Sequence, residues 1–394
     1  MLRENGATGR AVGVGWCRLP TAYDNGRVAG TLLATRPAEV AGARTPARDP
    51  ILDLLKAVGL LGIVIAHTNP PGWLYQLRNF GIPTMAFVAG AVMVESLARR
   101  EASTAAYLRR RVKQLFVPTW VFLTVGGAVL MLLSTLADEA WNYSAGKMLR
   151  AFLLLDGAAV TNTQVVRVFL LLSVSAPLWL ALRRRVPRVG PGLLALAGLW
   201  VGYELVCWAW AGWRHDAPWL VELLAEDVVG DTVGFGIFFA LGTRYRQLTR
   251  RHLLALAGLL AAGLVVFFEL RTGAWSTTQR WKWPPRFPYL AYAGMCGLTM
   301  AAAFRHFDVF HRLGRWTPIR TASAASLWFF FWHSFTLQLW NIFVGRNLFL
   351  IEVPVNVVVA YGLLTLEQHL VRSWLRRDLS DRARSRIRTV FAIR

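Results

Sequence analysis

From residue 51 onward the chain consists of recurring apolar segments, each long enough to cross a bilayer as a helix. About 20 apolar residues span the hydrocarbon core, and a helix satisfies its own backbone hydrogen bonds there. The predicted fold class is therefore all-α, a polytopic membrane protein of about ten transmembrane helices. The predicted spans are 51–68, 79–98, 115–136, 163–182, 191–211, 219–242, 252–270, 288–304, 322–343 and 351–371.

The basic residues between these segments predict the orientation of the chain. Ten spans bring both termini to the same side, and from residue 44 onward the chain segments on that side hold 28 arginines and lysines, against nine in the other loops. Positive residues concentrate on the cytoplasmic side of membrane proteins. Both termini are therefore predicted to be cytoplasmic in a multi-pass protein of the cell membrane, and the first helix is predicted to run outward.

Composition bears on the partners of the chain. A net charge of +22 could indicate a nucleic-acid-binding protein, but 55% of the residues are hydrophobic and the cations form short clusters between apolar segments. Membrane lipids are the expected partner, and no nucleic acid is expected. Cys17, Cys207 and Cys296 are too far apart to form a metal set, so no metal cofactor is expected.

Three segments fall outside the predicted spans. Residues 1–47 have no sustained apolar run and are predicted to be a disordered cytosolic arm, or a stretch that precedes the true translation start. Residues 48–372 form a single membrane domain, and 373–394 form a basic cytosolic tail. The segment 137–162 contains a helical pattern too short to cross, which predicts an interfacial helix on the outer side.

The first predicted helix carries two ionisable side chains, Lys56 and His67. At about 100° and about 1.5 Å per residue, eleven residues place them within about 20° on one face and about 16 Å apart. Ionisable groups are costly in hydrocarbon, so both are expected to face a polar cavity or a partner. Two alternatives stay open: Lys56 could reach the cytoplasmic interface, and His67 could be an ordinary interfacial histidine.

Acidic residues inside the sixth predicted span are further candidates. Glu226, Asp227 and Asp231 lie there, and the last two are four residues apart on one helix face. They could orient a histidine or bind acceptor hydroxyls, or they could form an ion pair with Arg167 or another buried cation. Asp53 is expected to pair with Lys56 or with an arginine.

Several short motifs follow one another along the chain. They are Asp53 to Lys56 followed after ten residues by His67, Phe80 to Gly90, Tyr107 to Pro118, and Ser326 to Ser334 with its Trp-His-Ser sequence. In this order, over nearly all of residues 48–371, they resemble the membrane acyltransferase 3 family, the O-acyltransferases of sugars and glycolipids. Arg167 to Leu170, and Lys282 to Pro285 with Tyr289, are similar to its fucose-acetylase-like branch.

The chain departs from the family pattern at two positions. Lys56 stands where the family usually has arginine, which keeps the charge but loses a bidentate fork for phosphate or carboxylate. Ala89 replaces the usual serine before Gly90, so a hydroxyl role at that position is absent.

The resemblance implies an enzyme that moves an acyl group, acetyl being the expected one, from acyl-CoA to a hydroxyl of an extracytoplasmic or lipid-linked carbohydrate. The transfer needs a base of near-neutral pKa to take the hydroxyl proton, and His67 is the predicted general base. Lys56, Arg111 and Lys113 are predicted to bind the acyl-CoA donor. The basic cluster 109–113 could equally be only a topology signal.

Six further residues are predicted on the substrate side: His333, Ser334, Asp227, Asp231, Arg167 and Tyr289. Ser334 leaves a covalent route formally open, but neighbouring helical residues such as His333 and Ser334 point about 100° apart and pair poorly. The tryptophan-rich loop 275–289 suits sugar stacking and interfacial anchoring equally.

The alternative class is a transporter or flippase of a polysaccharide precursor or other lipid-linked solute. Lys56, Asp227 and Asp231 would then form a relay or binding site within the membrane. Transporters commonly carry internal repeats, and no repeat stands out in this chain. The sequence leaves the acceptor, the acyl chain length and the oligomeric state open.

Overall fold

The computed structural model describes residues 48–98, 103–141, 143–155 and 160–391. These residues are largely helical and contain no strand, which confirms the predicted all-α class. The predicted arm 1–47 lies outside the described residues. The α-helices are α1 Pro50–His67, α2 Gly72–Leu77, α3 Gly81–Ala98, α4 Thr104–Val121, α5 Gly127–Leu136, α6 Ala145–Phe152, α7 Thr163–Arg185, α8 Val189–Trp213, α9 Trp219–Glu222, α10 Asp231–Thr243, α11 Arg250–Phe267, α12 Phe287–His306, α13 Asp308–Arg315, α14 Thr317–Ala324, α15 Ser326–Phe343, α16 Phe349–Leu375 and α17 Asp381–Val390.

Eight of the ten predicted spans coincide with helices that are long and apolar enough to cross a membrane, counted over the described ranges. This confirms a polytopic membrane protein. The helical segments are Pro50–His67, Gly72–Ser96, Thr104–Leu136, Thr163–Arg185, Val189–Asp216, Arg250–Arg271, Phe287–His306 and Phe349–Leu375.

The other two predicted spans are also helical, and each contains an irregular segment. The span 219–242 consists of the one-turn α9, a π-helical segment Leu223–Gly230, and α10. The span 322–343 is broken at Ala325, which has a non-helical backbone between α14 and α15. π-Helical turns and breaks of this kind often occur at functional sites, because they redirect side chains that a regular helix would align. Both interruptions lie beside polar groups described below.

The short amphipathic helices α6 and α17 lie outside the predicted spans. The segment 137–162 contains α6, as its helical pattern predicts, and the Ser144 side chain caps its first turn by accepting from Lys147 N. The predicted basic tail forms α17, which is held to α15 because Trp328 Nε1 donates to the Val390 carbonyl at 3.0 Å. The last turns of the described chain are therefore fastened to the helix bundle.

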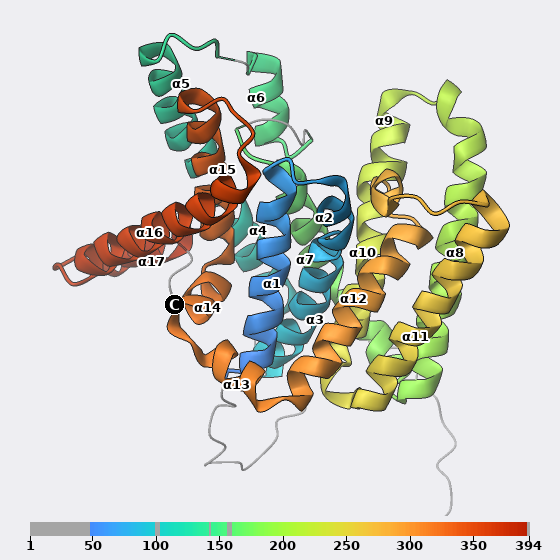
Figure 1. Cartoon of the computed structure of the whole chain (residues 1–394). Coiled ribbons are helices and arrows are strands. Elements are labelled where there is room, and N and C mark those ends of the chain that lie inside the picture. Colours follow the sequence, from blue (N-terminus) through green and yellow to red (C-terminus); the bar gives the residue numbers. More distant parts are fainter. Residues whose placement is uncertain (1–47, 99–102, 142, 156–159, 392–394) are drawn as a thin grey trace, which may run out of the picture. The chain divides into compact units, whose positions relative to one another are not determined.

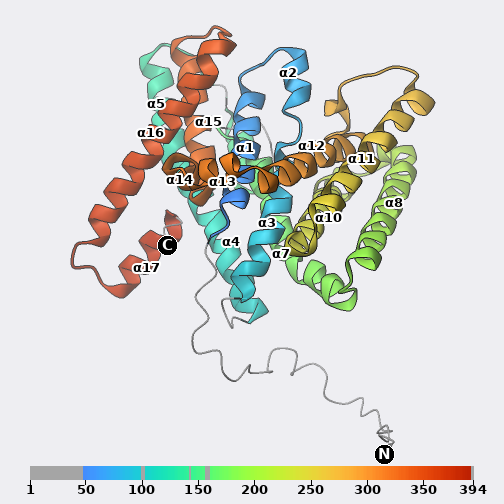
Figure 2. The same ribbon diagram turned by 60° about the horizontal axis from the view of Figure 1, so that its bottom comes forward.

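Helix α1 lies in the interior of the bundle. In both views it lies between α16 and α17 on one side and α8 and α11 on the other, and it contacts α3 and each of α12 to α16 (Figures 1 and 2). Its start is well defined, since the Asp49 side chain accepts from Ile51 N at 2.9 Å and Pro50 occupies the first turn. An interior α1 keeps the Lys56 and His67 side chains among protein neighbours.

Helices α3 and α10 pack with their backbones in close contact. A Cβ added at Gly90 would overlap the carbonyl group of Phe239, and one added at Gly242 would overlap that of Phe87. Small residues at a membrane helix interface permit such an approach, and it maximises dispersion contacts where burial from water contributes little. These two glycines therefore fix the helix pair that supports one side of the cavity described below.

We expect Gly90→Ala to lower the free energy of unfolding by about 1–3 kcal/mol, because the methyl group forces α3 and α10 apart. Gly258→Ala is the matched control, since a Cβ on that α11 residue meets no atom within 4 Å. It should leave stability unchanged or slightly raised. Thermal or denaturant unfolding in detergent measures both, and equal stabilities of the two variants would contradict the packing argument.

Candidate functional site

A cavity of about 260 Å³ lies along one face of α1, with walls from α3, α4, α7 and the α14–α15 break. Lys56, Leu60 and Ile63 line it from α1 at spacings of four and three residues, which is one helix face. His67 is the next residue of the same face, one turn beyond Ile63. The cavity thus follows the Lys56 to His67 face that the sequence predicts, and its lining reaches to within one turn of the histidine.

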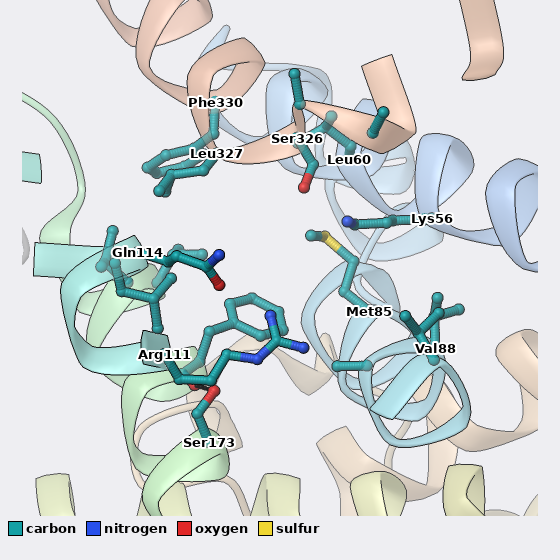
Figure 3. A pocket seen from close by; sticks show the side chains of 18 of the residues that line it. Lys56, Leu60, Met85, Val88, Arg111, Gln114, Ser173, Ser326, Leu327 and Phe330 are labelled. Carbon is teal, nitrogen blue, oxygen red and sulfur yellow. Dashed lines mark hydrogen bonds between the residues drawn. The ribbon is translucent and has the colours of Figure 1, made fainter. Parts of the chain in front are cut away.

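The polar lining of the cavity is cationic. Lys56 and Arg111 point into it from opposite sides (Figure 3), and Arg388 of α17 adds a third cation. Gln114 and Ser173 supply neutral polar groups. The sequence pointed to Lys56 and Arg111 but assigned Arg388 only to a basic tail.

Lys113 and Ala89, both singled out in the sequence, differ in whether they line the cavity. Lys113 is exposed and does not line the cavity, because two residues turn a helix by about 200° away from Arg111. The predicted role of Lys113 in donor binding therefore has no support from the lining of this cavity and stays a prediction. Ala89 does line the cavity, so a methyl group forms the wall where the family usually has a serine hydroxyl.

A hydrogen-bond network holds Lys56 at the α14–α15 break. Its Nζ donates to the Ser323 carbonyl at 2.9 Å, and the Ser323 hydroxyl donates to Asp53 Oδ1 at 2.7 Å. Asp53 is also paired with Arg48, whose Nε lies 2.5 Å from Oδ2. Of the two partners expected for Asp53, the observed ion pair is with the arginine. The Lys56 side chain therefore both caps the end of α14 and lines the cavity.

Beyond the cavity, His67 meets a second histidine. His67 Nδ1 lies 3.0 Å from Nε2 of His333 on α15, and the two ring planes differ by 7°. His333 is fully buried, and the ring of Phe330, which lines the cavity, lies 5.0 Å from it. The histidine pair and the cavity are thus separated by about one helical turn on both α1 and α15.

The pair has a defined chemical capacity. One of the two facing nitrogens must carry the proton, and a neutral imidazole has one donor and one acceptor nitrogen. When His67 Nδ1 donates to His333, His67 Nε2 has a free lone pair and can accept a proton from a hydroxyl group. His333 then acts through His67 and is a positioning residue.

Ser334 is placed differently from its neighbour. Its hydroxyl donates to the Phe330 carbonyl at 3.0 Å and accepts from the Thr161 hydroxyl at 3.0 Å. Neither contact is with a histidine, so the geometry of a serine activated by His333 is absent from the described contacts.

Arg167 of α7 forms an ion cluster with Asp227 and Asp231, in which Arg167 and Asp231 are buried. Arg167 Nη2 lies 2.6 Å from Asp227 Oδ1, and Nε lies 3.2 Å from Asp231 Oδ2. The π-helical turn that carries Asp227 directly precedes Asp231 at the start of α10. Of the roles considered for these carboxylates, the ion pair is the one observed.

Around His67 lie two cations that the sequence did not single out as site residues. Arg78, just after α2, and Lys282, just before α12, are both close enough to interact with it electrostatically. Tyr289, a predicted substrate residue, is buried and interacts with Arg78 and with Asp231. Burial, followed by the charge of Arg78, lowers the pKa of Lys282 to about 7. Arg78 and Lys282 are single cations in separate loops, and nothing in the sequence around either one indicates that they lie close together.

Within the described residues, no group of three His, Cys, Asp or Glu side chains is placed to hold a metal ion. Comparisons of the chain with curated proteins and with solved structures gave no match. A family model described as an acyltransferase domain, Acyl_transf_3, matches residues 49–366, which include the cavity face of α1, the histidine pair and the ion cluster. The chain therefore belongs to the acyltransferase 3 family and is a membrane acyltransferase.

Proposed function

We propose that the protein transfers an acyl group, acetyl in the simplest case, from acyl-CoA to a hydroxyl of an extracytoplasmic or lipid-linked carbohydrate. The observation that carries the proposal is the single face of α1 that joins a cationic cavity at Lys56 to a hydrogen-bonded histidine pair at His67. An acyl transfer between two chemically different substrates needs such a pairing of a donor site with a base.

The cavity suits the donor. Lys56, Arg111 and Arg388 would attract the phosphates of coenzyme A, since cationic side chains form strong charge-assisted hydrogen bonds with phosphate oxygens. The apolar lining between them and the histidines, Leu60 and Ile63 included, suits the thin acyl-bearing arm. With the orientation predicted from the basic loops, the cations lie on the cytoplasmic side, where acyl-CoA is made.

The transfer then needs one proton relay. The acceptor oxygen attacks the thioester carbonyl carbon while His67 Nε2 takes the hydroxyl proton. The carbon–sulfur bond breaks, and the proton passes from His67 to the departing sulfur, which leaves as the free thiol of coenzyme A. Throughout, His67 Nδ1 donates to His333 Nε2, which stabilises the transient imidazolium.

The transporter alternative has less support. It relied on Asp227 and Asp231 as a relay within the membrane, and both carboxylates bond to Arg167. The direct acyl-transfer route also needs no acyl-enzyme at Ser334, whose hydroxyl bonds to Phe330 and Thr161. The fucose-acetylase-like branch and the carbohydrate acceptor remain predictions.

Replacing His67 with Ala should reduce acceptor-dependent thiol release from acetyl-CoA by about 10²–10⁴-fold, the usual contribution of a general base. His369→Ala is the control, because that exposed histidine lies on α16 away from the pair. Membranes that carry equal amounts of each variant are assayed for thiol release and for acylated glycan by mass spectrometry. Full activity of the inserted His67→Ala protein would exclude the mechanism.

His333 should behave as a positioning residue. His333→Leu removes the acceptor for His67 Nδ1, so the acidic limb of the rate–pH profile should move and kcat should fall. His333→Gln offers an amide oxygen in a similar place and should restore part of the rate. A purely structural role predicts that both variants lose active protein without any change in the shape of the pH profile.

Arg111→Gln should raise the KM for acyl-CoA by about tenfold or more while kcat changes little, since a charge-assisted hydrogen bond contributes about 1.5–3 kcal/mol. Arg109→Gln removes the same charge from an exposed position of the same helix, outside the cavity, and should leave the KM unchanged. Equal effects of the two substitutions on the KM would indicate that the arginine cluster only sets the orientation of the helix in the membrane.

A further inference from the structure

Arg78 and Lys282 are two adjacent cations without a counter-ion. Among the residues that the structure describes, neither forms an ion pair, whereas Arg167 is paired with two carboxylates. Arg78 is only 5% exposed, and its Nε and Nη2 groups are buried without a hydrogen-bond partner. An arginine buried in this way leaves directed donors unused, close to the proposed catalytic histidine.

The surrounding contacts hold Arg78 firmly in this position. Its guanidinium carbon lies 3.8 Å from the centre of the Tyr75 ring. Directly after it, Asn79 Nδ2 donates to the Thr278 hydroxyl at 2.8 Å, and Gln76 Oε1 accepts from Thr278 N at 2.8 Å. These bonds join the end of α2 to the turn that leads to Lys282. Hydrogen bonds between distant segments of the chain therefore bring the two cations together.

Two neighbouring cations without a counter-ion are costly when one of them, Arg78, is buried. Removing charges from water carries a penalty that only an opposite charge and hydrogen bonds offset, and like charges add to it. The lowered pKa of Lys282 expresses the same cost. Asp231, which also interacts with Tyr289, is already bonded to Arg167. An anion that bound between Arg78 and Lys282 would satisfy the unused donors and remove the repulsion.

We propose that Arg78 and Lys282 form a subsite for an anionic oxygen group of the acceptor, a phosphate or a carboxylate, beside His67. The choice of the acceptor rests on the proposed function. The donor phosphates are assigned to Lys56 and Arg111, and Lys56 is about 16 Å from His67 along α1, so the cations at the His67 end serve the other substrate. The planar fork of Arg78 suits either oxygen group. The acceptor is thus an acidic sugar or a phosphate-linked glycan rather than a neutral one.

The test uses the full-length protein in detergent, without acyl-CoA. Inorganic phosphate and sodium glucuronate are titrated against sodium chloride at equal ionic strength, and the thermal midpoint is measured. We expect one of the two anions to raise the midpoint beyond the chloride effect, with apparent affinity weakened at least tenfold in Arg78→Gln and in Lys282→Gln. Protection by phosphate assigns a phosphate-linked acceptor, and protection by glucuronate assigns an acidic sugar.

Two control variants separate this subsite from other cations. Arg280→Gln lies in the same turn, exposed over the Trp281 ring at 3.9 Å, and should bind the anion as the wild type does. Arg111→Gln removes a donor-cavity cation. An anion effect that is lost in Arg111→Gln and kept in Arg78→Gln belongs to the donor cavity and overturns the proposal.

Absence of any anion effect beyond chloride in the wild type also overturns it, even if the Arg78 variant cannot be purified. The outcome is separate from that of the proposed function, because binding is measured without acyl transfer. Anion binding together with an active His67→Ala variant would refute the acyl-transfer mechanism alone. An inactive His67→Ala variant without anion binding would refute the subsite alone.

Discussion

Two imidazoles 266 residues apart share one hydrogen bond in the protein interior, and much of the site depends on that contact. A buried histidine needs a partner for its ring nitrogens, and His67 and His333 provide one for each other. The bond ties α1 to α15, and α15 begins at the break whose preceding carbonyl accepts from Lys56. The cavity between these two polar contacts is lined by the apolar residues of one α1 face.

Much of the fold could be predicted from local patterns. The length and hydropathy of a segment decide whether it can cross a bilayer, so eight spans follow directly from runs of apolar residues. The interruptions could not be predicted this way. The span 219–242 is apolar enough, but its π-helical turn brings Asp227 to Arg167, and the break at Ala325 lies where Ser323 bonds to Lys56. Both interruptions adjoin tertiary polar contacts.

The site could be predicted only where its residues share one element. Lys56 and His67 lie on one helix, so their common face follows from helix geometry. Arg388, Arg78 and Lys282 reach the site through contacts between distant segments, and no spacing along the chain encodes them. Lys113 is close in sequence to Arg111 but lies outside the cavity, because two residues turn a helix by about 200°.

At the break at Ala325, the capping of α14 and the binding of a ligand in the cavity are linked through one side chain. One ammonium group, that of Lys56, both caps the end of α14 and forms part of the cavity wall. A ligand that draws this group inward weakens its hold on the Ser323 carbonyl, and a firmly capped α14 holds the group back from the ligand. By linkage the two effects are equal in free energy. Occupation of the cavity and capping of α14 therefore depend on the same ammonium group, at the break after which α15 carries His333.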